Sequence, residues 1–301
     1  MLPFVKEAVQ RGYVVITPEY RGSTGYGAAH YNAIDYGGKE LDDVASAVDY
    51  LRTLGSVDPD RIGLLGHSHG GYITTLLLFR GRTPFRVGVA SAPVTNLVFR
   101  LASAGPRYER QFATQAGLRG LPFENRAEYI RRSPYYGVDS LRVPLFVYVA
   151  TNDEDVTFAE SRPLIDALQA RKPGLAETKV YVDPPPGPFS GGHSFAARVN
   201  PQTLERDDTP EQADAWARTW AFFARTLRPD APPDAPRAAP GRSPAAALSA
   251  TQRVPRPRAW NPGAWQGLAS PAGPSMIARL GESRRANEAC GSRRCAVLGV
   301  R

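Results

Sequence analysis

The feature that most constrains the fold of this chain is a regular alternation, along residues 1–228, of strand-like and helix-like segments. Segments rich in β-branched and aromatic residues indicate strands, and apolar side chains every three or four residues indicate helices. The predicted strands cover residues 13–20, 61–67, 85–92, 145–150 and 178–183, and the predicted helices cover 1–12, 39–54, 69–80, 161–171 and a final segment from 209. Such alternation favours helices packed on both faces of a mostly parallel sheet. We therefore predict an α/β fold whose functional residues lie beyond the carboxyl ends of the strands.

Residues 94–143 interrupt this alternation and carry seven aromatic residues among many Arg. We predict that they form a helical excursion over the sheet and one wall of a pocket, although packing is the more ordinary role for any single aromatic residue. With this excursion, residues 1–228 are predicted to form one domain.

Residues 229–301 differ in kind from the rest of the chain. They are rich in Pro, Ala and Arg, contain no Phe, Tyr or His, and carry seven of the eight net positive charges. Such a segment buries too little apolar surface to offset its chain entropy, so we predict a disordered tail. Its Arg residues lie among Pro rather than among stacking rings, which argues against a nucleic-acid partner. Cys290 and Cys295 lack a second pair or a nearby His, so no metal site is expected.

The chain carries no sequence signal for a membrane span or for export. No apolar run reaches the roughly 18 residues that a span needs. The first residues lack the basic flank, long apolar centre and small-residue cleavage site of a secretory signal. We therefore expect no membrane span and, by default, a cytoplasmic location; the oligomeric state has no signal.

The pentapeptide GHSHG, at residues 66–70, joins a predicted buried strand to a predicted buried helix. It fits the pattern G-x-S-x-G, in which a serine nucleophile stands at a sharp strand-to-helix turn. Three small residues would let the strand and the helix approach each other: Gly66, Gly70 and Gly71. We predict that Ser68 is the nucleophile and that the backbone N–H of His69 stabilises an oxyanion at the helix N-terminus. The alternative is a tight turn with an idle serine.

A serine nucleophile needs a base, and the chain has four histidines. His67 and His69 are chain neighbours of the serine, and their side chains are expected to diverge from it. His30 precedes the serine, whereas the order in this class of fold is Ser, acid, His. His193 follows the last predicted strand, at the sheet edge that holds Ser68. We therefore predict His193 as the base and a surface or packing role for His30.

The acid that orients the base is sought between Ser68 and His193. The candidates there are Asp139, Asp153, Asp155, Asp166 and Asp183. Asp166 lies within a predicted helix, and Asp139 precedes a strand, at the wrong end of the sheet. Asp153 and Asp155 both follow the strand at 145–150, at its carboxyl end. We predict Asp153 as the acid, which holds the imidazole tautomer and stabilises its charged form, and Asp155 stays open as an alternative.

Four stretches together resemble the catalytic domain of the prolyl oligopeptidase family of serine peptidases, which includes dipeptidyl peptidases and acylaminoacyl peptidases. They are GYVVITPEYRGSTGYG from residue 12, VDPDRIGLLGHSHGGY from 57, VATNDEDVTF from 149 and GGHSF from 191. The resemblance covers residues 1 to about 228 and places the triad on Ser68, Asp153 and His193. It also implies that Tyr72 and Val156 contribute to the pocket for the residue preceding the cut bond. Ala150 stands where the family pattern has Gly.

The resemblance also sets an expectation about missing parts. The family usually has an earlier strand that ends in a Gly-Gly-Pro type loop and helps form the oxyanion hole, and many members carry an amino-terminal propeller. That strand would lie in space between the segments 13–20 and 61–67, whereas Met1 falls in the helix that follows it. We therefore expect a sheet that lacks its first strands, with an unfilled slot, as in a fragment or a gene model begun too late. Such a chain should fold poorly or be weakly active.

The function implied by the resemblance and the predicted triad is hydrolysis of peptide bonds in short peptides through an acyl-enzyme, without metal or cofactor. Two alternatives stay open. One is a carboxylesterase that uses the same triad. The other is an inactive α/β-hydrolase fragment, with a partner-binding role.

Overall fold

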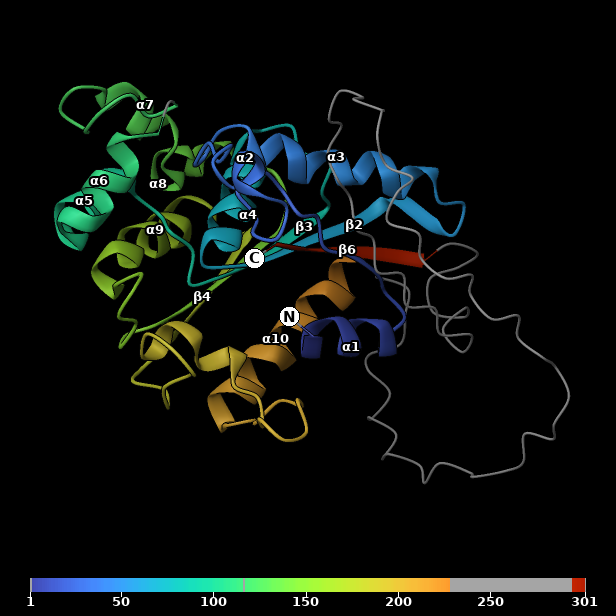
Figure 1. The fold of residues 1–301 in the computed structure, drawn as a ribbon. Coiled ribbons are helices and arrows are strands. Elements are labelled where there is room, and N and C mark those ends of the chain that lie inside the picture. The colour runs from blue at the N-terminus through green and yellow to red at the C-terminus, as the bar shows by residue number, and fades with distance from the viewer. Residues whose placement is uncertain (1, 116, 228–293, 301) are drawn as a thin grey trace, which may run out of the picture.

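The computed structural model of the protein describes residues 2–115, 117–227 and 294–300. In these residues, six strands form one sheet in the order β1-β6-β2-β3-β4-β5, and all adjacent pairs are parallel (Figure 1). The strands are β1 (Val14–Ile16), β2 (Val57–His67), β3 (Val87–Ser91), β4 (Leu145–Ala150), β5 (Ala176–Tyr181) and β6 (Arg294–Val300). The predicted α/β fold with a mostly parallel sheet is confirmed.

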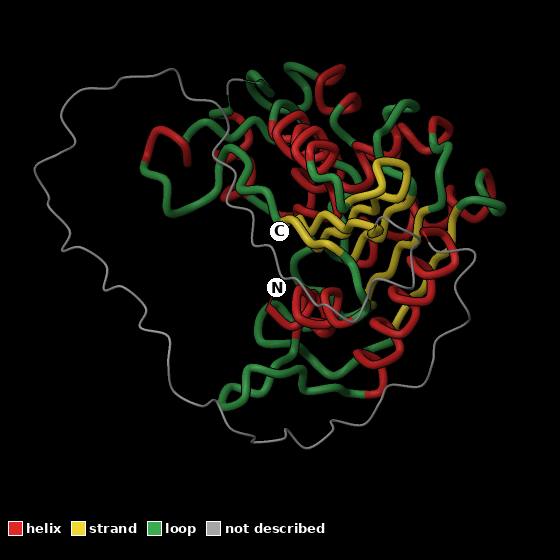
Figure 2. Tube along the Cα trace, turned by 90° about the vertical axis from the view of Figure 1, so that its right-hand side faces the viewer, coloured by secondary structure: helices red, strands yellow, loops and turns green. Residues whose placement is uncertain are grey.

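Helices cover both faces of the sheet, as Figure 2 shows. They are α1 (Leu2–Gln10), α2 (Ala28–Tyr31), α3 (Glu40–Thr53), α4 (His69–Phe79), α5 (Leu97–Ala104), α6 (Pro106–Ala113), α7 (Arg126–Arg131), α8 (Pro134–Gly137), α9 (Phe158–Arg171) and α10 (Pro210–Leu227), with short 3-10 turns at Val138–Ser140 and Gly192–Ala197. Phe4 of α1 and Trp220 of α10 belong to the core on one face. Leu41 of α3, Ile73 of α4 and Leu164 of α9 belong to the core on the other face. The sheet therefore lies between two apolar layers.

Local sequence explains why helix α4 is apolar and where helix α10 begins. Residues 70–79 of α4 are all buried, which is why this helix is apolar on every side rather than on one stripe. Helix α10 begins at Pro210, and the side chain of Thr209 caps it by accepting a hydrogen bond from the backbone N–H of Gln212 at 3.2 Å. Helices α5–α8 follow β3 and lie together at the upper left of Figure 1, beyond the end of α4.

Strand β6 comes from the far end of the chain and lies between β1 and β2 (Figure 1). Val297 pairs with Val15 on one side and with Gly63 on the other. Successive side chains of β6 enter opposite cores: Ala296, Leu298 and Val300 join the layer under α3 and α4, and Cys295 and Val297 join the layer under α1 and α10. The alternation is that of a strand buried on both faces.

This strand corrects two expectations from the sequence. The predicted disorder of 229–301 is wrong for residues 294–300, which form a buried strand; residues 228–293 and 301 lie outside the described residues. The unfilled slot expected between the segments 13–20 and 61–67 is also wrong, because β6 occupies that place and pairs with both neighbours. The backbone groups facing the slot therefore have partners.

Candidate active site

Ser68 stands alone between a strand and a helix, because β2 ends at His67 and α4 begins at His69. Its backbone dihedrals are φ 57° and ψ −118°, a conformation that non-glycine residues rarely adopt and that is common where function requires strain. The turn is held at both ends: the Ser68 N–H donates to the Ser91 carbonyl at 2.9 Å, and its carbonyl accepts from the Tyr72 N–H at 2.9 Å. The side chain is thereby presented at the carboxyl edge of the sheet.

The glycines around Ser68 are required by close contact between backbones. A Cβ on Gly66 would lie 2.0 Å from the carbonyl oxygen of Gly70, which no rearrangement of a side chain could relieve. A Cβ on Gly71 would lie 2.9 Å from the carbonyl oxygen of Ser91. The small residues therefore let α4 start directly against β2 and β3.

Three predicted residues from separate loops meet at this edge. Ser68 Oγ lies 2.9 Å from His193 Nε2, and His193 Nδ1 lies 2.8 Å from Asp153 Oδ2. His193 and Asp153 are 3% and 5% exposed. The second carboxylate oxygen of Asp153 accepts the backbone N–H groups of Asp155 at 2.9 Å and Val156 at 2.8 Å. The carboxylate is thus fixed by hydrogen bonds on both oxygens, with the imidazole held between it and the hydroxyl.

The loops that carry the predicted acid, Asp153, and the predicted base, His193, are joined to each other. Asp153 forms an isolated antiparallel bridge with Gly191, and the Gly192 N–H donates to the Asn152 carbonyl at 2.9 Å. Gly191 has φ 58°, and a Cβ there would lie 2.8 Å from the Asn152 carbonyl oxygen. The glycine pair before His193 therefore allows the close approach that sets the distance between acid and base.

The alternative acid, Asp155, and the other candidate base, His30, do not occupy the positions that a triad requires. Asp155 Oδ2 is 3.7 Å from His193 Nε2, on the side of the ring that faces Ser68, whereas Asp153 meets Nδ1. His30 lies in α2, with Nε2 3.0 Å from the Tyr20 carbonyl and its ring against Tyr26. Its described contacts are therefore with its own loop.

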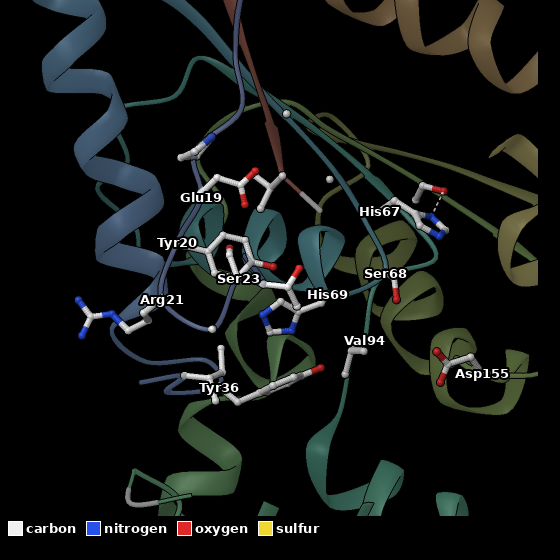
Figure 3. Close-up of a pocket in the computed structure, with 18 of the residues that line it drawn as sticks. Glu19, Tyr20, Arg21, Ser23, Tyr36, His67, Ser68, His69, Val94 and Asp155 are labelled. Atoms are coloured by element: carbon white, nitrogen blue, oxygen red, sulfur yellow. Dashed lines mark hydrogen bonds between the residues drawn. The ribbon is translucent and has the colours of Figure 1, made fainter. Parts of the chain in front are cut away.

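His67 has a contact that the sequence did not indicate. Its side chain was expected to diverge from the serine; it lies against the base, with ring centroids of His67 and His193 4.8 Å apart. His67 Nδ1 is 3.2 Å from Ser91 Oγ, the contact drawn dashed in Figure 3. Burial and the neighbouring His193 lower the pKa of His67 to about 3, so this ring is neutral at pH 7. No local pattern marks such a contact, because it depends on where a loop 126 residues away places its ring.

His69 is the first residue of α4, so its backbone N–H is one of the donors that a helix leaves without an internal partner. Its ring packs among aromatic rings, with centroid distances of 4.3 Å to Tyr36 and 5.8 Å to Tyr20 (Figure 3). Burial lowers the pKa of His69 to about 4. Glu40 Oε1 lies 3.9 Å from His69 Nε2, and burial raises the pKa of Glu40 to about 7. The helix start therefore lies among aromatic rings and beside a carboxyl group that is only partly ionised at pH 7.

A cavity of about 2330 Å³ opens beside these residues. Ser68, His67, His69, His193 and Asp155 line it, as do Gly299 and Val300 of β6. Tyr72 and Val156, expected in the substrate pocket, are 0% and 1% exposed and are not among its lining residues. The Tyr72 hydroxyl instead donates to the Arg132 carbonyl at 2.7 Å. Both residues stand behind the wall that a ligand would meet.

Two kinds of feature are absent from the described residues. Within those ranges no group of three or more His, Cys, Asp or Glu side chains is arranged to hold a metal ion. No helix of the described chain combines the length and the apolar character needed to cross a bilayer.

Comparison with known proteins bears on residues 4–198, which match the model of the prolyl oligopeptidase family. Dipeptidyl aminopeptidase BIII of Pseudoxanthomonas mexicana is 32% identical over 165 residues, which is 54% of this chain and 24% of that protein. The acylamino-acid-releasing enzyme of Arabidopsis thaliana is 27% identical over 179 residues, 58% of this chain and 23% of that protein. The chain therefore spans about a quarter of the length of the curated relatives that it matches.

Solved structures show the same fold. A puromycin-hydrolyzing peptidase of Mycobacterium tuberculosis superposes with a TM-score of 0.55 at 23% identity, over 69% of this chain and 28% of that one. The acylaminoacyl peptidase of Pyrococcus horikoshii superposes with a TM-score of 0.54 at 20% identity, over 69% and 31% of the two chains.

Proposed function

This chain belongs to the prolyl oligopeptidase family, and on that premise we propose that it hydrolyses peptide bonds of short peptides with Ser68, His193 and Asp153 as a catalytic triad. The observation that carries the proposal is the pair of hydrogen bonds, 2.9 Å and 2.8 Å long, at the two nitrogens of the buried His193. A base hydrogen-bonded to a nucleophile and oriented by a third group is the arrangement that activates a hydroxyl.

In the proposed mechanism each group has its own step. His193 Nε2 takes the proton of Ser68 as Oγ attacks the scissile carbonyl carbon, and the resulting imidazolium is stabilised by Asp153 through Nδ1. The oxyanion forms beside the start of α4, where the His69 N–H and the helix N-terminus favour negative charge. His193 then returns the proton to the leaving amine, which departs and leaves an acyl group on Ser68. A water molecule, deprotonated by the same base, releases the acid. No metal or cofactor enters these steps.

We also propose that the catalytic unit consists of residues 1–228 completed by β6. Strand β6 pairs with β2 up to Gly66, two residues before the nucleophile. Its last residues, Gly299 and Val300, line the cavity that contains Ser68. Both observations support one unit that combines the two parts of the chain.

The test uses the full chain and a fluorophosphonate probe, which labels only an activated serine. Wild-type protein should be labelled at Ser68 and should hydrolyse aminoacyl or Xaa-Pro p-nitroanilides, whereas Ser68→Ala should show neither property. Turnover of p-nitrophenyl butyrate without turnover of any anilide would favour the carboxylesterase. A folded sample, shown by circular dichroism, that takes up no probe would favour the inactive fragment.

A further inference from the structure

Beside the proposed triad lies a charged network that the mechanism above does not use. Arg100 of α5 has a side chain 3% exposed and lies between two carboxylates. One of its terminal nitrogens donates to Asp155 Oδ1 at 2.6 Å, and the other donates to Glu160 Oε2 at 3.1 Å. The Tyr108 hydroxyl also donates to Asp155 Oδ1, at 3.0 Å. Asp155 Oδ1 is therefore anchored by two donors from the α5–α8 region.

The other carboxylate oxygen of Asp155 is left facing the cavity. The described part of the chain offers Oδ2 no hydrogen-bond donor, and the ion-pair partner that it faces is His193 Nε2, at 3.7 Å. Figure 3 shows the oxygens of Asp155 on the side of that residue toward Ser68 and Val94. Asp155 and Arg100 both line the cavity. An immobilised carboxylate oxygen is thus aimed at the space where a substrate carbonyl must sit.

The charge of this network favours a cation. Arg100 supplies one positive charge that the two carboxylates of Asp155 and Glu160 share, and burial raises the pKa of Glu160. The network is negative when both carboxylates are ionised. Burial is the largest single influence and acts to raise the pKa of Asp155, but the charge and hydrogen bond of Arg100, together with His193 and Tyr108, lower the pKa by more, so this carboxylate is ionised at pH 7. An ionised carboxylate with one unpaired oxygen in a half-buried position is a binding site for an N–H donor, and most strongly for a charged one.

The distance between Ser68 and Asp155 indicates which cationic group of a substrate could reach Asp155 Oδ2. The attacked carbonyl carbon must approach Ser68 Oγ, which lies 2.9 Å from the same Nε2 that Asp155 Oδ2 faces. On the residue preceding the scissile bond, the α-nitrogen lies two covalent bonds from that carbonyl carbon, or about 2.5 Å. The cation of a Lys or Arg side chain lies at the end of a long flexible stem and would extend past Asp155. The α-nitrogen is therefore the group within reach of Oδ2.

We infer that Asp155 is a specificity-determining residue that binds the free α-ammonium group of the residue preceding the scissile bond, so that the site removes single amino-terminal residues. An acylated α-nitrogen offers one uncharged N–H and brings a substituent that must fit against Asp155. The inference rests on the proposed peptidase function and names its substrate class: peptides with an unblocked first residue.

The test compares alanine p-nitroanilide, N-acetylalanine p-nitroanilide and Ala-Ala p-nitroanilide in wild-type protein, Asp155→Asn and the control Glu154→Gln. Glu154 is the exposed neighbour of Asp155 and lies outside the cavity lining. Wild type should prefer the free single residue. Asp155→Asn should lower kcat/KM for alanine p-nitroanilide by on the order of 10- to 100-fold, the range of a charge-assisted hydrogen bond. It should change kcat/KM for the acetylated substrate by less than about threefold. Glu154→Gln should leave kcat/KM for both substrates unchanged.

A second readout does not depend on turnover. Alaninamide should slow fluorophosphonate labelling of Ser68 in wild type and in Glu154→Gln, but not in Asp155→Asn, for which the reference is the labelling rate of the same variant without alaninamide. Circular dichroism should show that the variant is folded.

Three results would overturn the inference. Equal losses for free and acetylated substrates in Asp155→Asn would make Asp155 a positioning residue for His193. Preferred cleavage of the acetylated or dipeptidyl substrate by wild type would place the recognised group elsewhere. Failure of the peptidase proposal itself is recognised separately, because wild type would then cleave none of the three anilides, whether or not Ser68 takes up the probe.

Discussion

The structure and the amino-acid composition predict different effects of mutation in strand β6. An unanchored Arg- and Pro-rich tail would tolerate truncation of any side chain, whereas a strand buried on both faces would not. Leu298 and Val297 are adjacent, both 0% exposed, and belong to opposite cores. The perturbation is therefore a pair of single substitutions, Leu298→Ala and Val297→Ala, with Leu204→Ala as a matched control at a leucine that is 61% exposed.

The expected magnitude follows from burial. Leu298 is in register with Ile16 of β1 and Leu64 of β2, so its truncation leaves a cavity in the layer under α3 and α4. Truncation of a buried Leu costs about 2–5 kcal/mol, and removal of two buried methyl groups from Val297 costs about 1.5–3 kcal/mol. A domain with roughly 5–15 kcal/mol of stability should show both losses clearly.

Urea unfolding of the full chain, followed by tryptophan fluorescence, measures these losses as shifts of the transition midpoint at constant slope. Leu204→Ala should lie within about 0.5 kcal/mol of wild type. If both β6 variants unfolded at the same urea concentration as the control and wild type, the strand would contribute nothing to the stability of the fold. If only one of them were destabilised, burial on both faces would be refuted.

Three further predictions concern the site. Gly66→Ala should destabilise the fold by more than about 3 kcal/mol and abolish probe labelling, since its Cβ would overlap a backbone carbonyl; thermal unfolding and labelling measure both. Burial raises the pKa of Glu40 to about 7 from its ordinary 4.5, so the protein loses stability as pH rises between these values. Urea titrations should show that the free energy of unfolding of Glu40→Gln rises relative to that of wild type across this pH range. His67→Ala should lower kcat/KM roughly 10- to 100-fold, and His67→Phe less, because only Phe keeps a ring against His193.

The layers of the fold could be predicted from sequence because their signals are local. The apolar periodicity within 39–54 reports the one face of that helix that is buried, and the continuous apolar run at 145–150 reports a strand buried on both faces. The signal for the proposed nucleophile, Ser68, is equally local, since the strand-to-helix turn and its glycines are contiguous. The choice of Asp153 and His193 follows from the rule that functional residues lie beyond the carboxyl ends of parallel strands. This rule predicts that two distant loops are neighbours without knowledge of any contact between them.

The parts that could not be predicted depend on tertiary contacts. Strand β6 is a short apolar run in a segment whose average composition is that of a disordered chain, and a run of this length is ambiguous on its own. Its partners in β1 and β2 lie more than 200 residues away in sequence. The Arg100 pair with Asp155 depends in the same way on how α5 folds back over the loop after β4. Neither charge pattern nor propensity marks which of many Arg will be buried there.

The position of β6 also connects the far end of the chain to the chemistry. Strand β2 is hydrogen-bonded to β3 on one side and to β6 on the other along residues 62–66, and the turn that holds Ser68 follows at once. The strained φ of Ser68 persists only where its surroundings over-determine it. Removal of one of the two flanking strands would leave the last residues of β2 free to relax, so that the turn and its hydroxyl would lose their fixed direction. Strand pairing at β6 and the reactivity of Ser68 are therefore expected to be lost together, rather than stability alone.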